Sequence, residues 1–376
     1  MRVLIVSGIW PPDVGGPASH APDVAQYLRA RGHSVEVVVT ADAEPAATGY
    51  PVRWTPRSYP VGVRHLHALA LVWRRARHVD VVYSTGMFGR SGIAAALAHR
   101  PLVVKLTGDP AFERLRARGA VGGDVDAFQD GAGGITARGL KQLRDRVLRR
   151  AAHVFTPSGW LRDLVITWGV PPERVSVMPN PTPFATPSAG RPELRRRFGL
   201  EGPALAFAGR LTAQKSLDVL LSALVECPGV ELLVAGDGDE REAVAGGIAR
   251  RGLGERARLL GPVSRQDVLD LFAAADATVL SSSWENFPHG VVESLAVGTP
   301  VISTRAGGVA EVVEDGVNGL LVDVGDTDAL AAAIRRYFSE DDLRARLRAG
   351  AAPSVEGYSP ERLLGALEQR LEESCR

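Results

Sequence analysis

Two glutamates lie eight positions apart in the stretch SWENFPHGVVESLAVGTPVIST, residues 283–304. Glu285 stands among loop formers, whereas Glu293 lies in an apolar run that predicts a helix, with Pro288 in its first turn and Gly298 at its end. A carboxylate near the helix start can accept two hydrogen bonds from vicinal hydroxyls, and Glu285 is placed for a sugar or a reacting centre. Paired acids also act in glycoside hydrolysis, and two solvent-facing glutamates are the plainer alternative.

Two cations follow a predicted strand in the stretch FAGRLTAQKSLDVLL. Arg210 leaves the strand end, and Lys215 directly precedes Ser216, the predicted N-cap of the next helix. Two cations beside a helix N-terminus suit a diphosphate, and they would stabilise it as a leaving group. A hydrolase needs no such site, so the pair argues against hydrolysis; solvated surface cations are the alternative.

Gly15 and Gly16, in the loop after the first predicted strand, would let the backbone approach a ligand, with a helix start behind them. Their spacing differs from the G-x-G-x-x-G of NAD-binding loops, and a simple turn is the alternative.

We expect no metal site. Asp237 and Asp239 have a spacing that some transferases use for a divalent ion, but acids at a helix start also satisfy its N–H groups. Asp124 and Asp126 are no stronger candidates, and His65 with His67 reads as a surface pair.

The composition excludes several classes of protein. The chain has 376 residues, 45% apolar and 23% charged, with a net charge of +1, which argues against a dedicated nucleic-acid binder. The first residues predict a strand rather than a signal peptide, and no apolar run approaches the length of a membrane span. Cys227 and Cys375 have no metal-ligand spacing, so we expect a reduced, cytoplasmic protein.

Only three of the 44 basic residues are lysines, which with the abundant Ala and Gly indicates a G+C-rich bacterial genome. Lysine retained in such a chain is a hint that a compact ammonium is preferred at Lys105, Lys141 and Lys215, and chance retention is the alternative.

Short β-branched runs alternate with helical patterns along the chain. The runs lack period-2 alternation, as expected of parallel strands covered on both faces, and they predict doubly wound sheets. In the first half they are 3–6, 34–39, 79–83, 101–106, 153–156 and 175–178. In the second half they are 204–208, 231–235, 257–260, 277–280, 300–303 and 320–322.

The pattern occurs twice, on either side of a Pro- and Thr/Ser-rich stretch at 179–194 that reads as a linker. We therefore predict two Rossmann-like domains facing one another across a cleft, with function in the loops after the strands. Residues 110–150 are rich in glycine and irregular, and they predict a mobile loop over the cleft that acts as an acceptor lid.

Taken together, the motifs resemble glycosyltransferase family 4, whose members are retaining enzymes of GT-B fold. The resemblance rests on the Glu-x7-Glu of 285–293, the GR…K of 209–215, the GG of 15–16 and the stretch GTPVISTRAGGVAEVVEDGVNGLLV at 298–322. It covers nearly the whole chain. It implies an acceptor domain over 1–182, a nucleotide-sugar donor domain over 183–355 and a C-terminal helix over 356–376 that crosses back to the first domain.

The resemblance also implies roles for individual residues. Gly209, Arg210 and Lys215 would bind the donor diphosphate, with Gly15 and Gly16 approaching it from the first domain. Glu293 would bind the ribose hydroxyls, and Glu285 would contact the transferred sugar. The backbone of Asn286, Phe287 and Pro288 would lie near that sugar, and the loop containing Val263 would hold the base. The donor would be a UDP-sugar or GDP-sugar, the acceptor a hydroxyl of a small molecule or glycan, and no metal would be needed.

The first domain departs from the family pattern, because Asp109 stands where many members have a histidine after the strand LVVKL. An ionised aspartate can accept a hydrogen bond from a sugar hydroxyl but cannot donate one. Asp109 is therefore a candidate catalytic residue whose equivalence is open. His20 could supply an imidazole, although a packed or surface histidine is the plainer interpretation.

Other functions remain compatible with these residues. They are a sugar-nucleotide epimerase, a pseudo-glycosyltransferase joining non-sugar rings, and a sugar-nucleotide-binding protein without catalysis. The basic segments 141–150 and 191–198 could meet anionic lipid at a membrane surface, but both carry acids and read as solvated helix faces.

Overall fold

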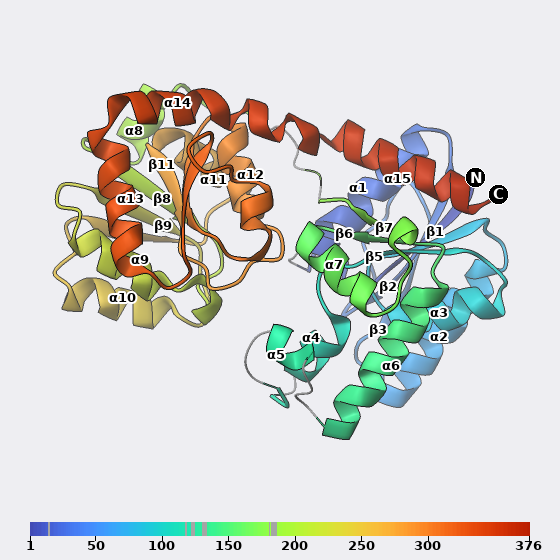
Figure 1. The fold of residues 1–376 in the computed structure, drawn as a ribbon. Helices are drawn as coiled ribbons and strands as arrows, with labels where there is room; N and C mark the ends of the chain where they lie inside the picture. Colours follow the sequence, from blue (N-terminus) through green and yellow to red (C-terminus); the bar gives the residue numbers. More distant parts are fainter. Residues whose placement is uncertain (14–15, 117–118, 122–124, 130–133, 180, 182–185) are drawn as a thin grey trace. The chain divides into compact units, whose positions relative to one another are not determined.

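The structure is a computed structural model of residues 1–376 (Figure 1). It describes all of them except 14–15, 117–118, 122–124, 130–133, 180 and 182–185, and except the side chains of 16–19 and 126–127. The chain forms two compact units. Unit 1 comprises Met1–Pro181 together with Glu361–Arg376, and unit 2 comprises Thr182–Pro360.

Unit 1 is built on a seven-stranded parallel sheet with the strand order β3-β2-β1-β4-β5-β6-β7. The strand order reverses at β1, which pairs with β2 on one side and β4 on the other, as in Rossmann-like sheets. Its strands are β1 (Arg2–Ser7), β2 (Ser34–Ala41), β3 (Val52–Pro56), β4 (Val81–Ser84), β5 (Leu102–Lys105), β6 (His153–Thr156) and β7 (Val175–Val177). Its helices before the linker are α1 (Gly16–Ala30), α2 (Val61–Ala76), α3 (Phe88–Leu97), α4 (Pro110–Arg116), α5 (Val125–Gln129), α6 (Gly134–Arg150), α7 (Gly159–Thr167) and η1 (Pro172–Arg174).

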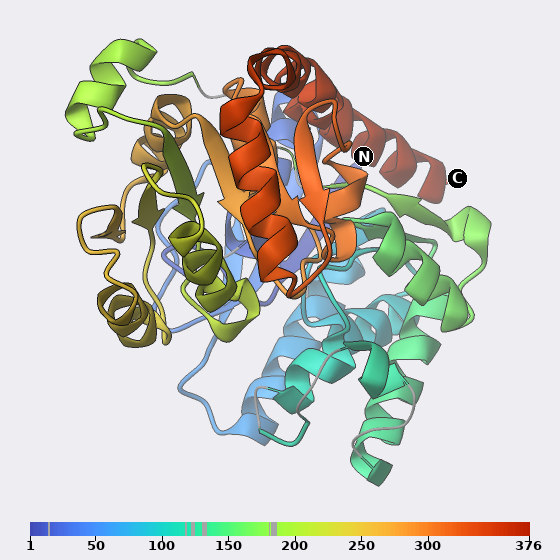
Figure 2. The same ribbon diagram turned by 60° about the vertical axis from the view of Figure 1, so that its left-hand side comes forward.

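Unit 2 repeats the design with six parallel strands in the order β10-β9-β8-β11-β12-β13. Helix α13 lies over this sheet (Figure 2), and its Leu330 and Ile334 belong to the same core as Ile302 and Leu320 of the sheet. The strands are β8 (Ala204–Ala208), β9 (Glu231–Ala235), β10 (Ala257–Gly261), β11 (Ala277–Leu280), β12 (Val301–Thr304) and β13 (Gly319–Val322). The helices are α8 (Arg191–Arg197), η2 (Ala213–Lys215), α9 (Leu217–Val225), α10 (Arg241–Arg250), α11 (Arg265–Ala274), α12 (His289–Ala296), η3 (Gly307–Glu311), α13 (Thr327–Ser339), α14 (Asp341–Ala351) and η4 (Pro353–Tyr358).

The predicted doubly wound fold is confirmed, and each of the twelve predicted runs contains a strand. The sequence missed β3, because VRWTP lies at the sheet edge and alternates exposed and covered residues instead of forming a buried run.

Two expectations about irregular regions were wrong in part. Within 110–150 the described residues form α4, α5 and α6 rather than an irregular loop. Residues 117–118, 122–124 and 130–133 of the predicted loop lie outside the described residues. In the predicted linker, residues from Arg191 onward already form α8, whose Leu194 is buried in a core cluster of unit 2.

The C-terminal helix α15 (Pro360–Ser374) completes the core of unit 1 and runs beside α1 in Figure 1. Leu364, Leu367 and Leu371 are buried with Val3 and Val35 of the sheet. Polar contacts also hold the helix. Glu368 accepts a hydrogen bond from Nε2 of His33 at 2.7 Å and forms an ion pair with Arg31 at 3.3 Å. In the part of the chain that the structure describes, every helix is too short or too polar to span a membrane.

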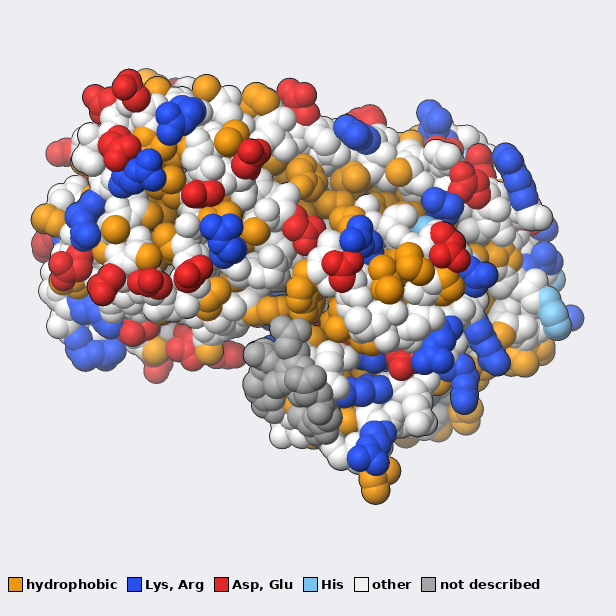
Figure 3. Space-filling view, in the orientation of Figure 1, with side chains coloured by type: hydrophobic (Ala, Val, Ile, Leu, Met, Phe, Trp, Pro, Cys, Tyr) orange, Lys and Arg blue, Asp and Glu red, His pale blue; other side chains and the backbone are white. Residues whose placement is uncertain are grey.

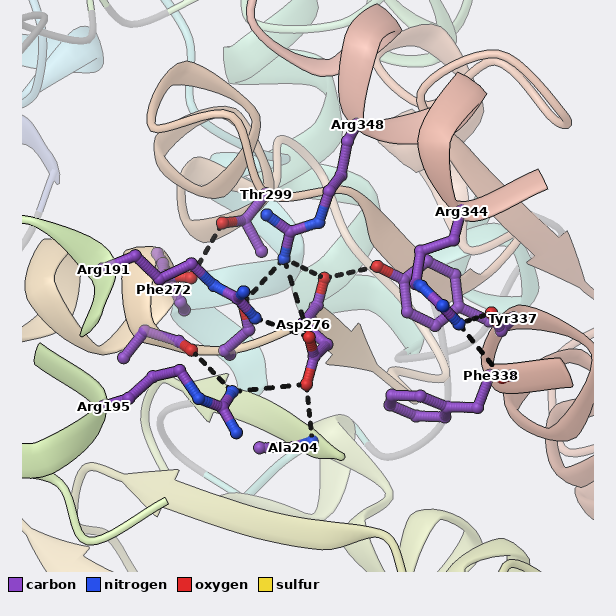
Figure 4. A network of polar contacts seen from close by, with 12 residues as sticks. Arg191, Arg195, Ala204, Phe272, Asp276, Thr299, Tyr337, Phe338, Arg344 and Arg348 are labelled. Atoms are coloured by element: carbon purple, nitrogen blue, oxygen red, sulfur yellow. Dashed lines mark hydrogen bonds and ion pairs between the residues drawn. The ribbon is translucent and has the colours of Figure 1, made fainter. Parts of the chain in front are cut away.

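Asp276, which immediately precedes β11, organises the amino-terminal edge of the sheet in unit 2 (Figure 4). Its carboxylate accepts hydrogen bonds from the Ala204 backbone at 2.9 Å and from Arg191 at 2.5 Å, with Arg195 at 3.4 Å. Its carbonyl accepts hydrogen bonds from Tyr337 at 2.5 Å and Arg348 at 3.1 Å. This single residue therefore ties α8, α13 and α14 to the sheet, at the edge opposite to the strand ends.

Replacing Asp276 with Ala is expected to lower the free energy of unfolding of unit 2 by about 3 kcal/mol, because it leaves several arginines facing one another without an anion. Urea unfolding, with hydrogen exchange to assign the loss to unit 2, measures the effect. Asp323→Ala, which removes an exposed acid without a side-chain partner among the described residues, is the control. Equal stability of the two variants would contradict this account.

Candidate functional site

The best-defined group of candidate residues lies in unit 2, where β8, β11 and β12 end. Parallel strands place their carboxyl ends at one edge of the sheet, so the loops after them meet there. Gly209 and Lys215 follow β8, Ser282 and Glu285 follow β11, and Gly307 follows β12.

An ion pair links the first two of these loops. Lys215 Nζ donates to Glu285 Oε1, and the hydroxyl of Ser282 donates to the same oxygen at 2.6 Å. Glu285 is only 6% exposed, so these two donors compensate a charge that would be unfavourable if buried alone. The lysine stem passes the Gly209 backbone, with its Cε 3.8 Å from the position that a Cβ on Gly209 would take. The structure thus brings together Gly209, Lys215 and Glu285, as predicted.

Backbone contacts fix the third loop and the neighbouring β9 loop. A Cβ on Gly307, whose φ is +50°, would lie 2.0 Å from the Glu285 carbonyl oxygen, and Gly308 donates its N–H to that oxygen at 3.0 Å. A Cβ on Gly236, whose φ is +129°, would lie 1.9 Å from the carbonyl oxygen of Gly209. Only glycine fits at these two positions, so the loops approach as closely as their backbones allow. Ser282 and Gly307 were not singled out from the sequence, although both stand inside motifs that were.

Arg210 differs from Lys215 in being free. Its side chain is exposed and makes no hydrogen bond or ion pair with any described residue. The structure does not bring its guanidinium into contact with the Lys215–Glu285 pair, so its predicted binding of phosphate stays a prediction. Ser216 occupies the N-cap position of α9 as predicted, but the cap is backbone only: its φ is +46° and its hydroxyl caps no N–H.

Glu293 lies in the second turn of α12, which begins after Pro288 and is followed by Gly298 at φ +78°. The neighbouring Arg265 donates to Glu293 at 3.2 Å from Nε. Burial raises the pKa of Glu293, and Arg265 partly offsets that rise. The Glu293 carboxylate is thus mostly covered and pairs with a mostly exposed arginine.

The other residues predicted to bind the donor surround these acids. Phe287 packs its ring against His289 and Tyr358, with centroids 5.3 and 5.8 Å apart, and Pro288 is buried. Asn286 and Val263 are half-buried. Their predicted backbone contacts with a donor stay predictions.

Asp237 and Asp239 do not form part of a metal-like cluster. Asp237 accepts a hydrogen bond from the Gly238 N–H at 2.9 Å and faces Arg241 at 3.8 Å. Among the described residues, the only group of three or more possible ligands is His33, Glu368 and Glu372, which belongs to the attachment of α15.

In unit 1, Asp109 is not available to a substrate, which contradicts the role predicted for it. Its side chain is fully buried; Oδ1 accepts from the Ala111 N–H at 2.8 Å, and Oδ2 accepts from Gln129 at 2.9 Å and from Arg144 at 2.5 Å. An aspartate at the start of α4 with a buried arginine partner stabilises the fold.

The structure shows no candidate site at the remaining predicted residues of unit 1 that it describes. Gly15 and Asp124 lie outside the described residues, as does the side chain of Asp126, and Gly16 is the first residue of α1. His20 is packed, with Nε2 2.8 Å from the hydroxyl of Tyr83. Of the two histidines predicted to lie at the surface, His67 is exposed and lies 3.0 Å from Thr55, whereas His65 is half-buried and lies 3.3 Å from Arg90.

A cavity of about 590 Å³ lies where β1, β4 and β5 end in unit 1. The loops after β1 and β4 form one side, since a Cβ on Gly86 would lie 2.5 Å from the Gly8 nitrogen. Glu113, Arg90 and Arg114 line it. Sequence analysis missed all three, because Arg90 of α3 lies far along the chain from Glu113 and Arg114 of α4 and none of them stands in a motif.

Glu113 has the most perturbed carboxyl group of this cavity. Burial, reinforced by Asp109, raises its pKa from 4.5 to about 7. No cation pairs with it among the described side chains. At neutral pH the cavity therefore contains a carboxyl group that can both donate and accept a hydrogen bond.

The comparisons with known proteins agree with this geometry. Residues 191–352 match the family described as "Glycosyl transferases group 1", and residues 15–181 match the "Glycosyl transferase 4-like domain". The D-inositol 3-phosphate glycosyltransferase of Nocardiopsis dassonvillei is 31% identical over 91% of this chain and 85% of its own length. The chain belongs to glycosyltransferase family 4.

Other relatives match more locally. The lipopolysaccharide core biosynthesis glycosyltransferase LpsE of Rhizobium meliloti is 36% identical over 46% of this chain and 50% of its own length. For several such relatives the match spans about half of the relative's length.

Solved structures show the same fold. Anabaena HepE in complex with UDP and glucose has a TM-score of 0.80 at 23% identity, covering 99% of this chain and all of that one. The lipopolysaccharide glycosyltransferase WaaG has a TM-score of 0.73 at 17% identity, covering 99% of each chain. At these identities the likeness concerns the fold, and that fold is GT-B.

Replacing Glu113 with Gln is expected to stabilise the protein increasingly as the pH rises from about 5 to about 8. The unfolded carboxyl has a pKa near 4.5 and the folded one about 7, so between these values the native state binds more protons and wild-type stability falls with rising pH. Urea unfolding at both pH values measures the difference. Glu201→Gln, at an exposed site, is the control, and the same change at both pH values would contradict the assignment.

Proposed function

We propose that the chain transfers a glycosyl group from a nucleoside-diphosphate sugar to a hydroxyl acceptor, with retention of anomeric configuration and without a metal ion. The observation that carries this proposal is the cluster of Gly209, Lys215 and Glu285 at the strand ends of unit 2. A cation, an acid and a glycine backbone at one sheet edge suit a diphosphate with a sugar attached. The glycosyltransferase relatives, and the UDP and glucose named for HepE, support it.

In this proposal Arg210 and Lys215 bind the diphosphate, and Glu293 binds the ribose hydroxyls. The loop at Val263 holds the base through backbone groups, and the donor is a UDP-sugar or a GDP-sugar. Glu285 contacts the transferred sugar, with the backbone of residues 286–288 beside it. Because Lys215 and Ser282 occupy one oxygen of Glu285, the second oxygen is the one that can accept from a sugar hydroxyl.

The reaction then runs by front-face displacement. The bond from the anomeric carbon to the phosphate oxygen breaks, the bond from that carbon to the acceptor oxygen forms, and the acceptor proton moves to the departing phosphate oxygen. The residues position the partners and stabilise the separating charge, which needs no protein nucleophile. The buried Lys215–Glu285 pair agrees with this course, because a carboxylate neutralised by an ammonium is a poor nucleophile.

Arg210→Ala is expected to weaken UDP or GDP binding about 10- to 100-fold, the effect of one charge-assisted hydrogen bond. Calorimetry of the nucleoside diphosphates measures this. Because the Arg210 side chain makes no hydrogen bond or ion pair with a described residue, the melting temperature of the variant should equal that of the wild-type protein. Arg196→Ala, at an exposed arginine of α8, is the matched control, and unchanged binding in Arg210→Ala would overturn the assignment.

Lys215 needs a different design, because removing it leaves Glu285 buried without its cation. Lys215→Met is expected to abolish turnover and also to lower stability by about 3 kcal/mol. Adding Glu285→Gln should restore much of the stability but none of the turnover, measured by unfolding and by product formation from a nucleotide sugar. Full activity in folded Lys215→Met would contradict the role of the ammonium. Incubation with the donor alone separates transfer from epimerisation, since an epimerase converts the donor without an acceptor.

A further inference from the structure

The cavity of unit 1 has mostly apolar walls but carries cations. Helix α6 contributes Leu140, Leu143 and Val147, and Met87 and Ile9 come from the loops after β4 and β1. A volume of about 590 Å³ lies in the range of ordinary small-molecule sites.

Arg90 and Arg114 line this cavity together with Glu113, but the structure pairs neither arginine with that carboxyl group. Neither forms an ion pair with any carboxylate whose side chain the structure describes, and the nearest polar partner of Arg90 is His65 Nδ1, at 3.3 Å. Burial, together with the charges of Arg114 and Arg64, lowers the pKa of Arg90 to about 10. Like charges are thus held together in a partly buried place, an arrangement that an anion would relieve.

Other partly buried arginines of the chain show the contrast. Arg144, which also lines the cavity, is neutralised by Asp109 at 2.5 Å and Asp145 at 2.8 Å. Arg57 pairs with Asp13 and with Asp42, and their hydrogen bonds raise its pKa. Arg90 differs from these two arginines because no carboxylate pairs with it among the described residues.

The start of α3 adds to the positive potential. Met87, the N-cap residue, has φ +53° and gives no side-chain cap, and residues 86–89 line the cavity. The first N–H groups of a helix carry partial positive charge and favour an anion. Around α3 and α6, Figure 3 shows many Lys and Arg side chains and few acids on the visible face of unit 1, and α6 exposes Arg138, Arg146, Arg149 and Arg150.

We propose that this cavity binds an anionic group of the acceptor, a phosphate monoester or a carboxylate, with Arg90 and Arg114 as its ligands. The proposal rests on the proposed transferase function and adds the substrate class: a hydroxyl compound that also carries a negative charge. The apolar wall from α6 packs against the body of the acceptor. An acceptor phosphate belongs either to a free sugar or polyol phosphate or to a lipid headgroup, and the two share this chemistry.

The test measures binding without a donor, so that it does not depend on transfer. Calorimetry at fixed ionic strength compares glucose 6-phosphate and gluconate with glucose, and sedimentation compares phosphatidylcholine vesicles with and without phosphatidylglycerol. The anionic member of each soluble pair, or the anionic vesicle, is expected to bind wild-type protein, and the neutral member is not. Binding of the soluble anions assigns the free source, and binding of the vesicles alone assigns the lipid source.

The variants are Arg90→Gln and Arg114→Gln, with Arg138→Gln on the exposed face of α6 as the matched control. Each cavity variant is expected to weaken anion binding about tenfold or more, whereas the control and the Kd for UDP stay unchanged. Arg114 is exposed, so its variant tests the cavity even if Arg90→Gln does not fold. Anion binding that survives both substitutions, or that drops equally in the control, would overturn the proposal.

The two proposals fail separately. If anions bind in an Arg90-dependent way but no nucleoside diphosphate binds and no donor is consumed, the cavity is an anion site and the transferase proposal is wrong. If donor and turnover are intact but neutral acceptors serve as well as anionic ones in wild-type protein and in Arg90→Gln, the substrate class is wrong.

Discussion

The parallel alignment of buried strands is the constraint on which the rest of the molecule depends. It requires every strand of a sheet to end at the same edge. Loops from distant parts of the sequence therefore meet there, even where they make no contacts with one another. In unit 2 this brings Lys215 to Glu285, 70 residues later in the chain. The opposite edge has another task, since Asp276 there binds three surrounding helices to the sheet. The contacts that hold the helices and the cluster of candidate site residues thus lie at opposite edges of one sheet.

The three lysines of this arginine-rich chain each donate to acceptors at the end of the side chain. Lys105 is fully buried and donates to the carbonyl oxygens of Met178 at 2.7 Å and Pro179 at 3.2 Å, and burial lowers its pKa to about 7. Lys141 donates to the carbonyl oxygens of Phe128 and Gln129 and stands 4.2 Å above the Phe128 ring. With Lys215 at Glu285, each ammonium meets its acceptors at the end of a stem in a confined space.

Local patterns predicted most of the fold, because buried parallel strands are written as uninterrupted β-branched runs. They missed β3, where one edge of the strand is unpaired and its residues need not be apolar. At the site, Gly209, Lys215 and Glu285 could be predicted because each stands in a motif. Asp109 was misassigned because its position suggested a substrate contact, whereas its partner Arg144 lies 35 residues further along, beyond any local pattern. The pKa values of the cavity residues Glu113 and Arg90 are shifted by neighbours that the fold brings together, and no sequence spacing encodes those neighbours.

The helix α15 makes unit 1 a discontinuous body, since residues 361–376 supply Leu364, Leu367 and Leu371 to a core begun by residues 1–181. Unit 2 is uninterrupted within 182–360. During synthesis, the core of unit 1 can therefore close only after residues 361–376 have been made, whereas unit 2 has all of its own residues once residue 360 has been made. A chain that lacks residues 361–376 would contain all of unit 2, but its unit 1 would expose the apolar surface that α15 covers.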